Sequence, residues 1–221
     1  MSERAQVGTT PADQVPAEPH TPVTGGRLGR DDIARLRAAR PAESLDLSGK
    51  DLREADLRGV DLVAANLAGA NLRGAILDGA HLSGADLTGA TLDGARLEGA
   101  DLRHARLVEA SLRQAELSGA HLEQALLHGA HLEHAHLPHA RLDGARLRDA
   151  RFDGATLWGA SLRGAELESG HFAGADLHDV DLEGAFFAGS ALADADLALA
   201  RWGDRRAGEE LAARRAPLAE R

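Results

Sequence analysis

The feature that most restricts the fold of this chain is a repeat of five residues. From Leu45 to Asp204 the repeat runs without a slip through 32 consecutive pentapeptides. We call its large apolar position i, which holds Leu in 28 pentapeptides and otherwise Phe152, Phe172, Phe187 or Trp202. Position i−2 is Ala in 26 pentapeptides, and position i+2 is Gly in 18. Most of the chain must therefore adopt a structure with this period.

Neither a helix nor a straight strand can use a period of five. In a helix, successive leucines would be rotated by about 140° and would scatter around the axis. In a strand, they would alternate between the two faces. The pattern favours a short extended piece followed by a corner, so that every Leu and every Ala points inward. Gly at i+2 suits a turn with positive φ. Because Glu54, Gln114, His139 and Asp179 also occupy i+2, we expect some corners to use another turn.

Three pieces of the chain carry a recognisable pattern, A(D/N)LxG. They are ADLRG at 55–59, ANLAG at 65–69 and ADLTG at 85–89. In this pattern the chain resembles the pentapeptide repeat proteins. The resemblance implies an all-β fold, a right-handed quadrilateral parallel β-helix with four pentapeptides per coil. Residues 45–204 would then form about eight coils, with short α-helical caps at the ends.

The N-terminal flank is expected to close one end of the rod, because open β-edges pair with other chains. Residues 29–44 are predicted to form a capping helix that Pro41 stops. Asp31 or Asp32 would cap its first turn, and Ile33 and Leu36 would share a face. Residues 1–28, rich in Pro, Thr, Gly and Glu, are predicted to be a flexible tail.

The C-terminal flank is expected to close the other end and to join two chains. Residues 205–221 are predicted to form a capping and dimerisation helix, broken at Pro217. Trp202, Leu211 and Leu218 would supply the apolar surface of the interface. The sequence therefore predicts a homodimer.

The repeat leaves little room for catalysis or a cofactor, because Leu and Ala fill the interior. No nucleotide-binding, zinc-protease or hydrolase motif occurs in the sequence. We predict no catalytic residues and no cofactor. Eleven histidines are present, five of them at 128, 131, 134, 136 and 139. His81, Asp101 and His121 recur every 20 residues and have the side chains of a zinc site, but solvated surface residues explain them better. We therefore predict no metal site.

Composition narrows the location and the partners. The chain has no Cys, its N-terminus has no apolar core of a signal peptide, and no run of 18 apolar residues occurs. We expect a cytoplasmic protein without a membrane span. The net charge of −10 argues against direct binding to nucleic acid.

The negative charge is concentrated near the C-terminal end of the repeats. Residues 45–104 carry ten acids and six bases, and residues 105–164 carry seven of each. Residues 165–204 carry nine acids against Arg201 alone. The predicted partner-binding surface consists of Glu166, Glu168, Asp176, Asp179, Asp181, Glu183, Asp194 and Asp196. We expect the i−1 members of this set, Asp176 and Asp181 among them, to be exposed and free of structural roles.

The resemblance also implies a function. The best-understood pentapeptide repeat proteins are dimeric rods that imitate duplex DNA and protect topoisomerases from fluoroquinolones and related poisons. On this basis we expect a non-enzymatic DNA mimic that binds DNA gyrase or topoisomerase IV. This chain departs from those relatives in its plain Leu/Ala repeats, its lack of an interrupting loop and its arginine-containing C-terminal segment. The alternative is a scaffold or interaction module for another protein.

Overall fold

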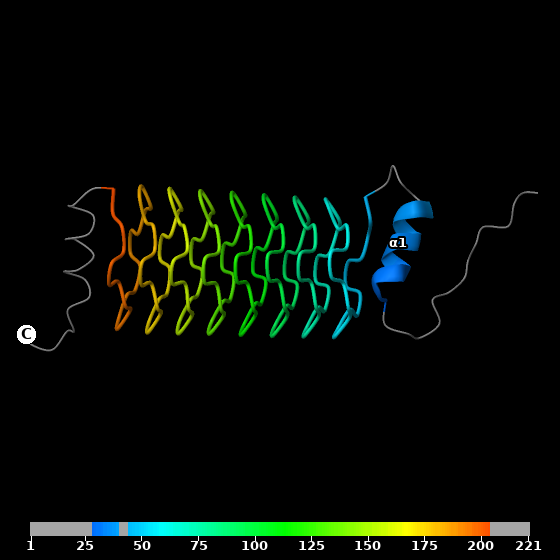
Figure 1. Ribbon diagram of the computed structural model, residues 1–221, viewed down its shortest axis with the longest axis horizontal. Helices are drawn as coiled ribbons and strands as arrows, with labels where there is room; N and C mark the ends of the chain where they lie inside the picture. The colour runs from blue at the N-terminus through cyan, green and yellow to red at the C-terminus, as the bar shows by residue number, and fades with distance from the viewer. Residues whose placement is uncertain (1–27, 40–43, 204–221) are drawn as a thin grey trace, which may run out of the picture.

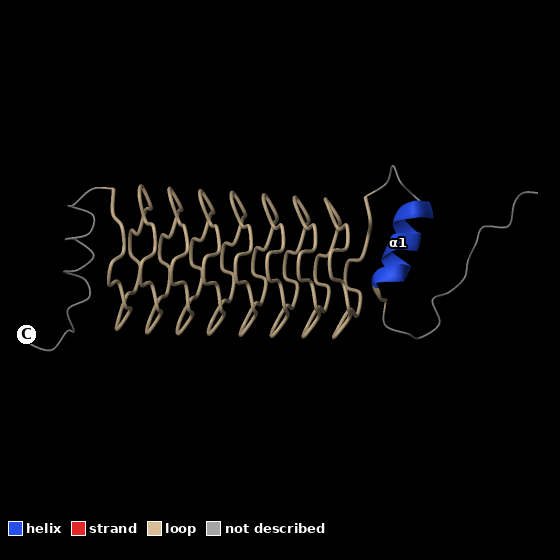
Figure 2. Ribbon diagram, viewed as in Figure 1, coloured by secondary structure: helices blue, strands red, loops and turns tan. Residues whose placement is uncertain are grey.

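The computed structural model describes residues 28–39 and 44–203 of the 221 residues. Within them, helix α1 (Arg30–Ala39) lies at one end of a rod, and the last coil lies at the other (Figure 1). The rod contains no continuous strand in these ranges, and its ribbon is drawn throughout as loop (Figure 2). Instead, 28 isolated parallel bridges connect residues that lie 20 positions apart, from Asp46↔Asn66 to Asp181↔Arg201. A corner every five residues leaves room for only one bridging residue per side.

Four bridges at each step of 20 residues define a four-sided coil, as predicted. We number the eight coils by their residues: 46–65, 66–85, 86–105, 106–125, 126–145, 146–165, 166–185 and 186–203. The parallel β-helix is therefore present, and its right hand remains a prediction.

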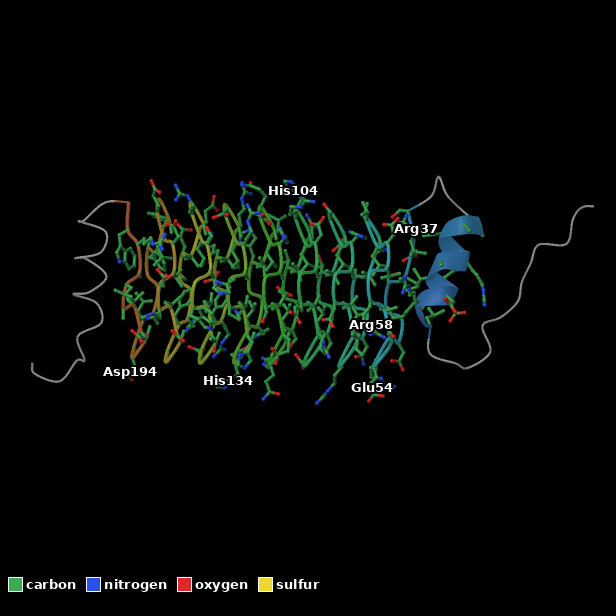
Figure 3. The ribbon with its side chains drawn as sticks, viewed as in Figure 1. Arg37, Glu54, Arg58, His104, His134 and Asp194 are labelled. Atoms are coloured by element: carbon green, nitrogen blue, oxygen red, sulfur yellow. The ribbon has the colours of Figure 1, made fainter. Side chains whose placement is uncertain are left out.

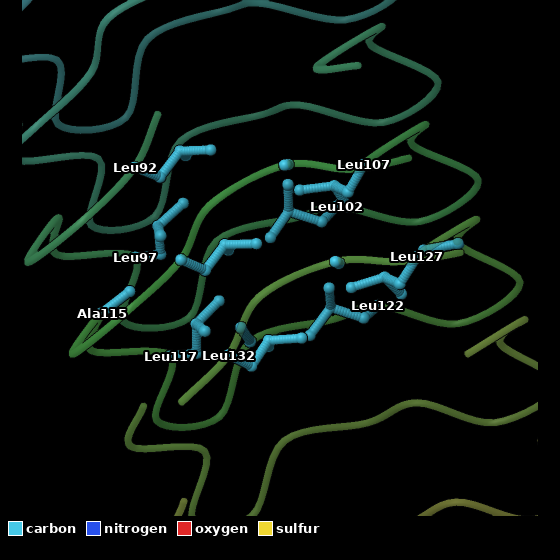
Figure 4. Close-up of a cluster of buried hydrophobic side chains, with 14 of the residues drawn as sticks. Leu92, Leu97, Leu102, Leu107, Ala115, Leu117, Leu122, Leu127 and Leu132 are labelled. Carbon is cyan, nitrogen blue, oxygen red and sulfur yellow. The ribbon is translucent and has the colours of Figure 1, made fainter. Parts of the chain in front are cut away.

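The core is a column of leucines and alanines that runs through the rod. Leu97 and Leu102 are fully buried, as is Ala100 between them (Figure 4 shows their neighbours). Towards the C-terminal end aromatic rings replace leucine, and Phe152 and Phe172 stack with their centroids 5.0 Å apart. At that end Trp202 is partly buried, 6.0 Å from the ring of Phe187. The phase of five thus separates inside from outside along the whole rod.

All described corners use the same turn, contrary to our expectation. The amide of Lys50 donates to the carbonyl of Leu47 (3.1 Å), and this bond recurs at the following corners. Residue i+2 has φ between 52° and 74° whether it is Gly or not, as at Ala64 (52°). These are the features of a type II turn. The prediction of mixed turns was wrong because each coil must follow the path of its neighbour to keep the bridges in register.

Helix α1 begins and ends within the predicted range of 29–44, but its cap differs from the prediction. Gly29 is the N-cap, since its carbonyl accepts the amides of Asp32 (3.1 Å) and Ile33 (3.2 Å). Asp32 instead reaches back to the amide of Gly29 (3.0 Å), as the third residue of a capping box does. Ile33 is fully buried, whereas Leu36 is 39% exposed, so they do not share a buried face. Pro41 lies outside the described residues.

Candidate functional site

The acidic surface is concentrated in one coil rather than spread evenly over the last two. Coil 7 carries six carboxylates and no Lys or Arg: Glu166, Glu168, Asp176, Asp179, Asp181 and Glu183. The described part of coil 8 adds Asp194 and Asp196 but also Arg201. Coil 6 carries four arginines at 146, 148, 151 and 163, so a sharp change of charge separates coils 6 and 7.

Half of the eight predicted carboxylates form ion pairs with arginines of the neighbouring coils. The pairs are Arg146–Glu166 (3.8 Å), Arg163–Asp181 (2.9 Å), Arg163–Glu183 and Arg201–Asp179 (3.1 Å). The hydrogen bond to Asp181 and the charge of Glu183 raise the pKa of Arg163. Exposed pairs of this kind contribute little to stability. They do lower the charge that this surface offers to a partner.

The other four carboxylates form no ion pair with any described residue; they are Glu168, Asp176, Asp194 and Asp196. We call them the unpaired set. Asp176 and Asp196 are bridge partners on one side of coils 7 and 8, so two like charges lie directly opposite each other. Such pairs destabilise a sheet. Asp194 lies at the adjoining corner, at the outer edge of the last coil (Figure 3).

The i−1 aspartates also hold the corners together, a role that the sequence-based prediction missed. Oδ1 of Asp176 accepts the backbone amide of His178 (3.0 Å), and Oδ1 of Asp196 accepts that of Ala198 (2.9 Å). Asn66 makes the same bond with Ala68 (3.1 Å). The prediction that Asp176 and Asp181 are exposed and structurally free was wrong, since both are half-buried and both accept such a bond. The D/N position of the A(D/N)LxG pattern was the available signal.

The three candidate zinc ligands occupy neighbouring coils but do not form a metal site. His81 and His121 both bridge to Asp101. Both oxygens of Asp101, however, accept from the guanidinium of Arg103, at 2.8 and 2.7 Å. This fork lowers the pKa of Asp101 to about 2. No three His, Asp or Glu side chains among the described residues are placed to hold a metal ion.

The five histidines of coil 5 are distributed around the rod. His131 lies between Arg113 (3.1 Å) and Glu133 (3.4 Å), and the ring of His139 meets Trp158 edge to face at 4.2 Å. Glu133 also pairs with Arg151 of the next coil (3.2 Å). The two cross-coil contacts made by arginine each span 18 residues, a signal that the sequence carries but that a search for recurrences at 20 residues overlooks.

Within the described ranges, no helix is long and apolar enough to cross a membrane.

Comparison with known proteins identifies the repeat. A family model for pentapeptide repeats matches in eight copies, over residues 43–73, 65–103, 105–144, 130–168 and 171–201. No protein with a curated description matches significantly.

Two solved structures illustrate the similarity. HetL, a pentapeptide repeat protein involved in heterocyst differentiation regulation in the cyanobacterium Nostoc sp., is 35% identical; the match covers 80% of this chain and 98% of HetL, with a TM-score of 0.36. Trypsin-treated QnrB1, a plasmid-mediated fluoroquinolone resistance protein, is 24% identical; the match covers 75% and 82%, with a TM-score of 0.51. The second match supports the fold alone.

Proposed function

We propose, because this chain belongs to the pentapeptide repeat family, that it is a non-enzymatic DNA mimic. Its partner would be DNA gyrase or topoisomerase IV, whose DNA-binding surface offers Lys and Arg to phosphates. The acidic surface of coils 7 and 8 would occupy that surface and protect the enzyme from topoisomerase poisons. Solved relatives with this fold have different stated roles, so the proposal depends on the charges of this chain.

The opposed aspartates Asp176 and Asp196 carry the proposal. The corner hydrogen bond that each makes needs only an oxygen acceptor, and Asn supplies it in coil 2 at Asn66 and Asn71. Asp adds a negative charge that opposes its neighbour and has no cation among the described residues to offset it. A basic partner would offset both charges at once, and electrostatic complementarity of this kind favours association.

The test is inhibition of DNA supercoiling by purified gyrase or topoisomerase IV. The wild-type protein should compete with DNA and protect the enzyme against a poison, and its binding should weaken as salt is raised, because charges are screened within about 10 Å at 0.1 M. The variant D176N/D196N, extended by Glu168→Gln and Asp194→Asn, should weaken inhibition strongly. These changes remove charge and retain an oxygen acceptor at each position.

A matched control makes the same chemical change elsewhere. Asp46→Asn with Asp86→Asn removes two i−1 charges from coils 1 and 3, where Asp46 and Asp86 also accept corner amides at 3.0 Å. This variant should inhibit like the wild type. If the wild-type protein has no effect on supercoiling at any concentration, the proposal is wrong.

A second candidate is a scaffold for another basic protein. It is favoured by the arginines of coil 6 and the histidines of coil 5, which interrupt the acidic surface of the rod. A scaffold predicts no effect on supercoiling, together with salt-sensitive capture of a different partner that D176N/D196N abolishes.

A further inference from the structure

The backbone hydrogen bonds of the rod are directional. In coil 7, the amides of Leu167 and Ser169 donate forward to the carbonyls of Phe186 and Ala188 in coil 8 (2.7 and 2.8 Å). One amide donates back, from Phe186 to Ala165 (2.9 Å). The same two-to-one pattern recurs through the rod. The two ends of the rod therefore differ, with an excess of free carbonyls at the N-terminal end and of free amides at the C-terminal end.

The N-terminal end shows how such an excess is satisfied. Nη2 of Arg37 in α1 donates to the carbonyl of Val63 (2.5 Å), and Ser44 Oγ donates to that of Ala64 (2.8 Å). One coil later, the carbonyl at the position of Val63, that of Ser83, accepts the amide of Ala64 (2.9 Å). A side-chain donor of α1 thus replaces the amide of a missing coil (Figure 3 labels Arg37).

The C-terminal end presents the opposite requirement. Six forward-pointing amides of coil 8 have no acceptor among the described residues: those of Phe187, Gly189, Leu192, Asp194, Leu197 and Leu199. On the same three sides, only three carbonyls await a donor. Phe187 and Leu192 are 6% and 2% exposed, so water does not readily satisfy their amides, and unmet buried donors are costly.

We propose that the C-terminal end of the rod is a hydrogen-bond donor surface that binds carboxylates. Its occupant is the segment 204–221 of this chain, with Glu209 and Glu210 as the acceptors. The segment follows directly from Gly203 at this edge. Six or seven extended residues reach about 20 Å, enough to bring these carboxylates over the end of the rod. Negative charge also complements the excess of N–H groups.

A second copy is a weaker occupant on the same geometry. Two C-terminal ends brought face to face would oppose donors with donors, so they could not continue the bridges into each other. A dimer at this end would need acceptors between the two rods. Carboxylates of the 204–221 segments would meet that need while Leu211 and Leu218 remained available for the partner.

Residue-resolved amide hydrogen exchange on the full chain tests the proposal. In the wild type, the amides of Phe187, Leu192 and Leu197 should be protected, and Glu209→Ala with Glu210→Ala should speed their exchange by about tenfold or more. The matched variant Arg214→Ala with Arg215→Ala should leave them unchanged. Amides of coil 4, such as those of Leu112 and Leu117, report whether each variant is folded.

Three results would overturn the proposal. One is rapid exchange of the coil 8 amides in the wild type, which would mean that nothing covers them. Another is equal acceleration by the arginine and glutamate variants, which would indicate general packing of the segment. The third is protection that disappears on dilution, which would assign the surface to a second copy. None of these results depends on a topoisomerase, so the proposal stands or falls independently of the proposed function.

Discussion

The ring of Phe172 occupies the space that a side chain at Gly170 would need. A Cβ placed on Gly170 would lie 2.7 Å from Cε2 of Phe172 and 3.1 Å from the carbonyl oxygen of Leu167. Phe172 cannot easily move away, because it is fully buried and stacked on Phe152. Gly170 stands at an i−2 position that is usually Ala, so the large ring and the missing methyl group are one adaptation.

Gly170→Ala should therefore destabilise the rod although it restores the commonest residue of the repeat. Overpacking predicts a loss of roughly 1–3 kcal/mol in the free energy of unfolding, measured by urea denaturation. Adding Phe172→Leu should remove most of the penalty of the alanine, and the double-mutant cycle should show strong coupling. Additive effects would mean that the two residues do not compete for this space.

Replacement of a non-glycine corner residue by Gly should stabilise the rod. Ala64 has a φ of 52°, and a left-handed conformation costs an L-residue roughly 1–2 kcal/mol, against roughly 0.5–1 kcal/mol for the added freedom of Gly. Ala64→Gly should thus raise the free energy of unfolding by about 0.5 kcal/mol or more. Its neighbour Val63 lacks a positive φ, so Val63→Gly should lower stability in the same thermal or urea assay. The same sign for both variants would contradict this account.

The Asp101–Arg103 fork should make stability depend on pH in the acid range. The pKa of Asp101 is lowered from 3.8 to about 2, chiefly by the hydrogen bonds from Arg103. A depressed folded-state pKa gives stability that is present above about pH 4 and is lost as the pH falls towards 2. Asp101→Asn keeps an acceptor for the Arg103 amide and loses the fork. Urea unfolding between about pH 4 and 2 should therefore show a shallower pH dependence in this variant, and Arg103→Gln should reproduce it.

We predict that the chain is a homodimer joined through residues 202–221. Trp202 leaves part of its indole uncovered in the described structure, while Leu211 and Leu218 lie outside the described residues. Removal of residues 205–221 should convert the dimer to a monomer in sedimentation or light scattering. The surface variant D46N/D86N should keep the parent mass. A truncated protein that retained the dimer mass would place the interface elsewhere.

Much of the acidic surface could be predicted from the sequence, because the phase of five assigns Asp176 and Asp196 to outward positions of neighbouring coils. Its effective charge could not. Arg146 reaches Glu166 and Arg163 reaches Asp181 only because residues 18 or 20 positions apart become neighbours when coils stack. A count of charges in a window of sequence misses such pairs, since each arginine belongs to coil 6 and each carboxylate to coil 7.

The sequence by itself determined which side chains face the interior. Only a chain that turns every fifth residue can bury Leu97, Ala100 and Leu102 together, because burial of apolar surface leaves no other use for that period. The tertiary structure decided what happens at the corners and ends. The left-handed conformation of Ala64 and the free amide of Phe187 arise from stacking, in which each coil must copy the path of its neighbour and the last described coil has no neighbour to accept its amides.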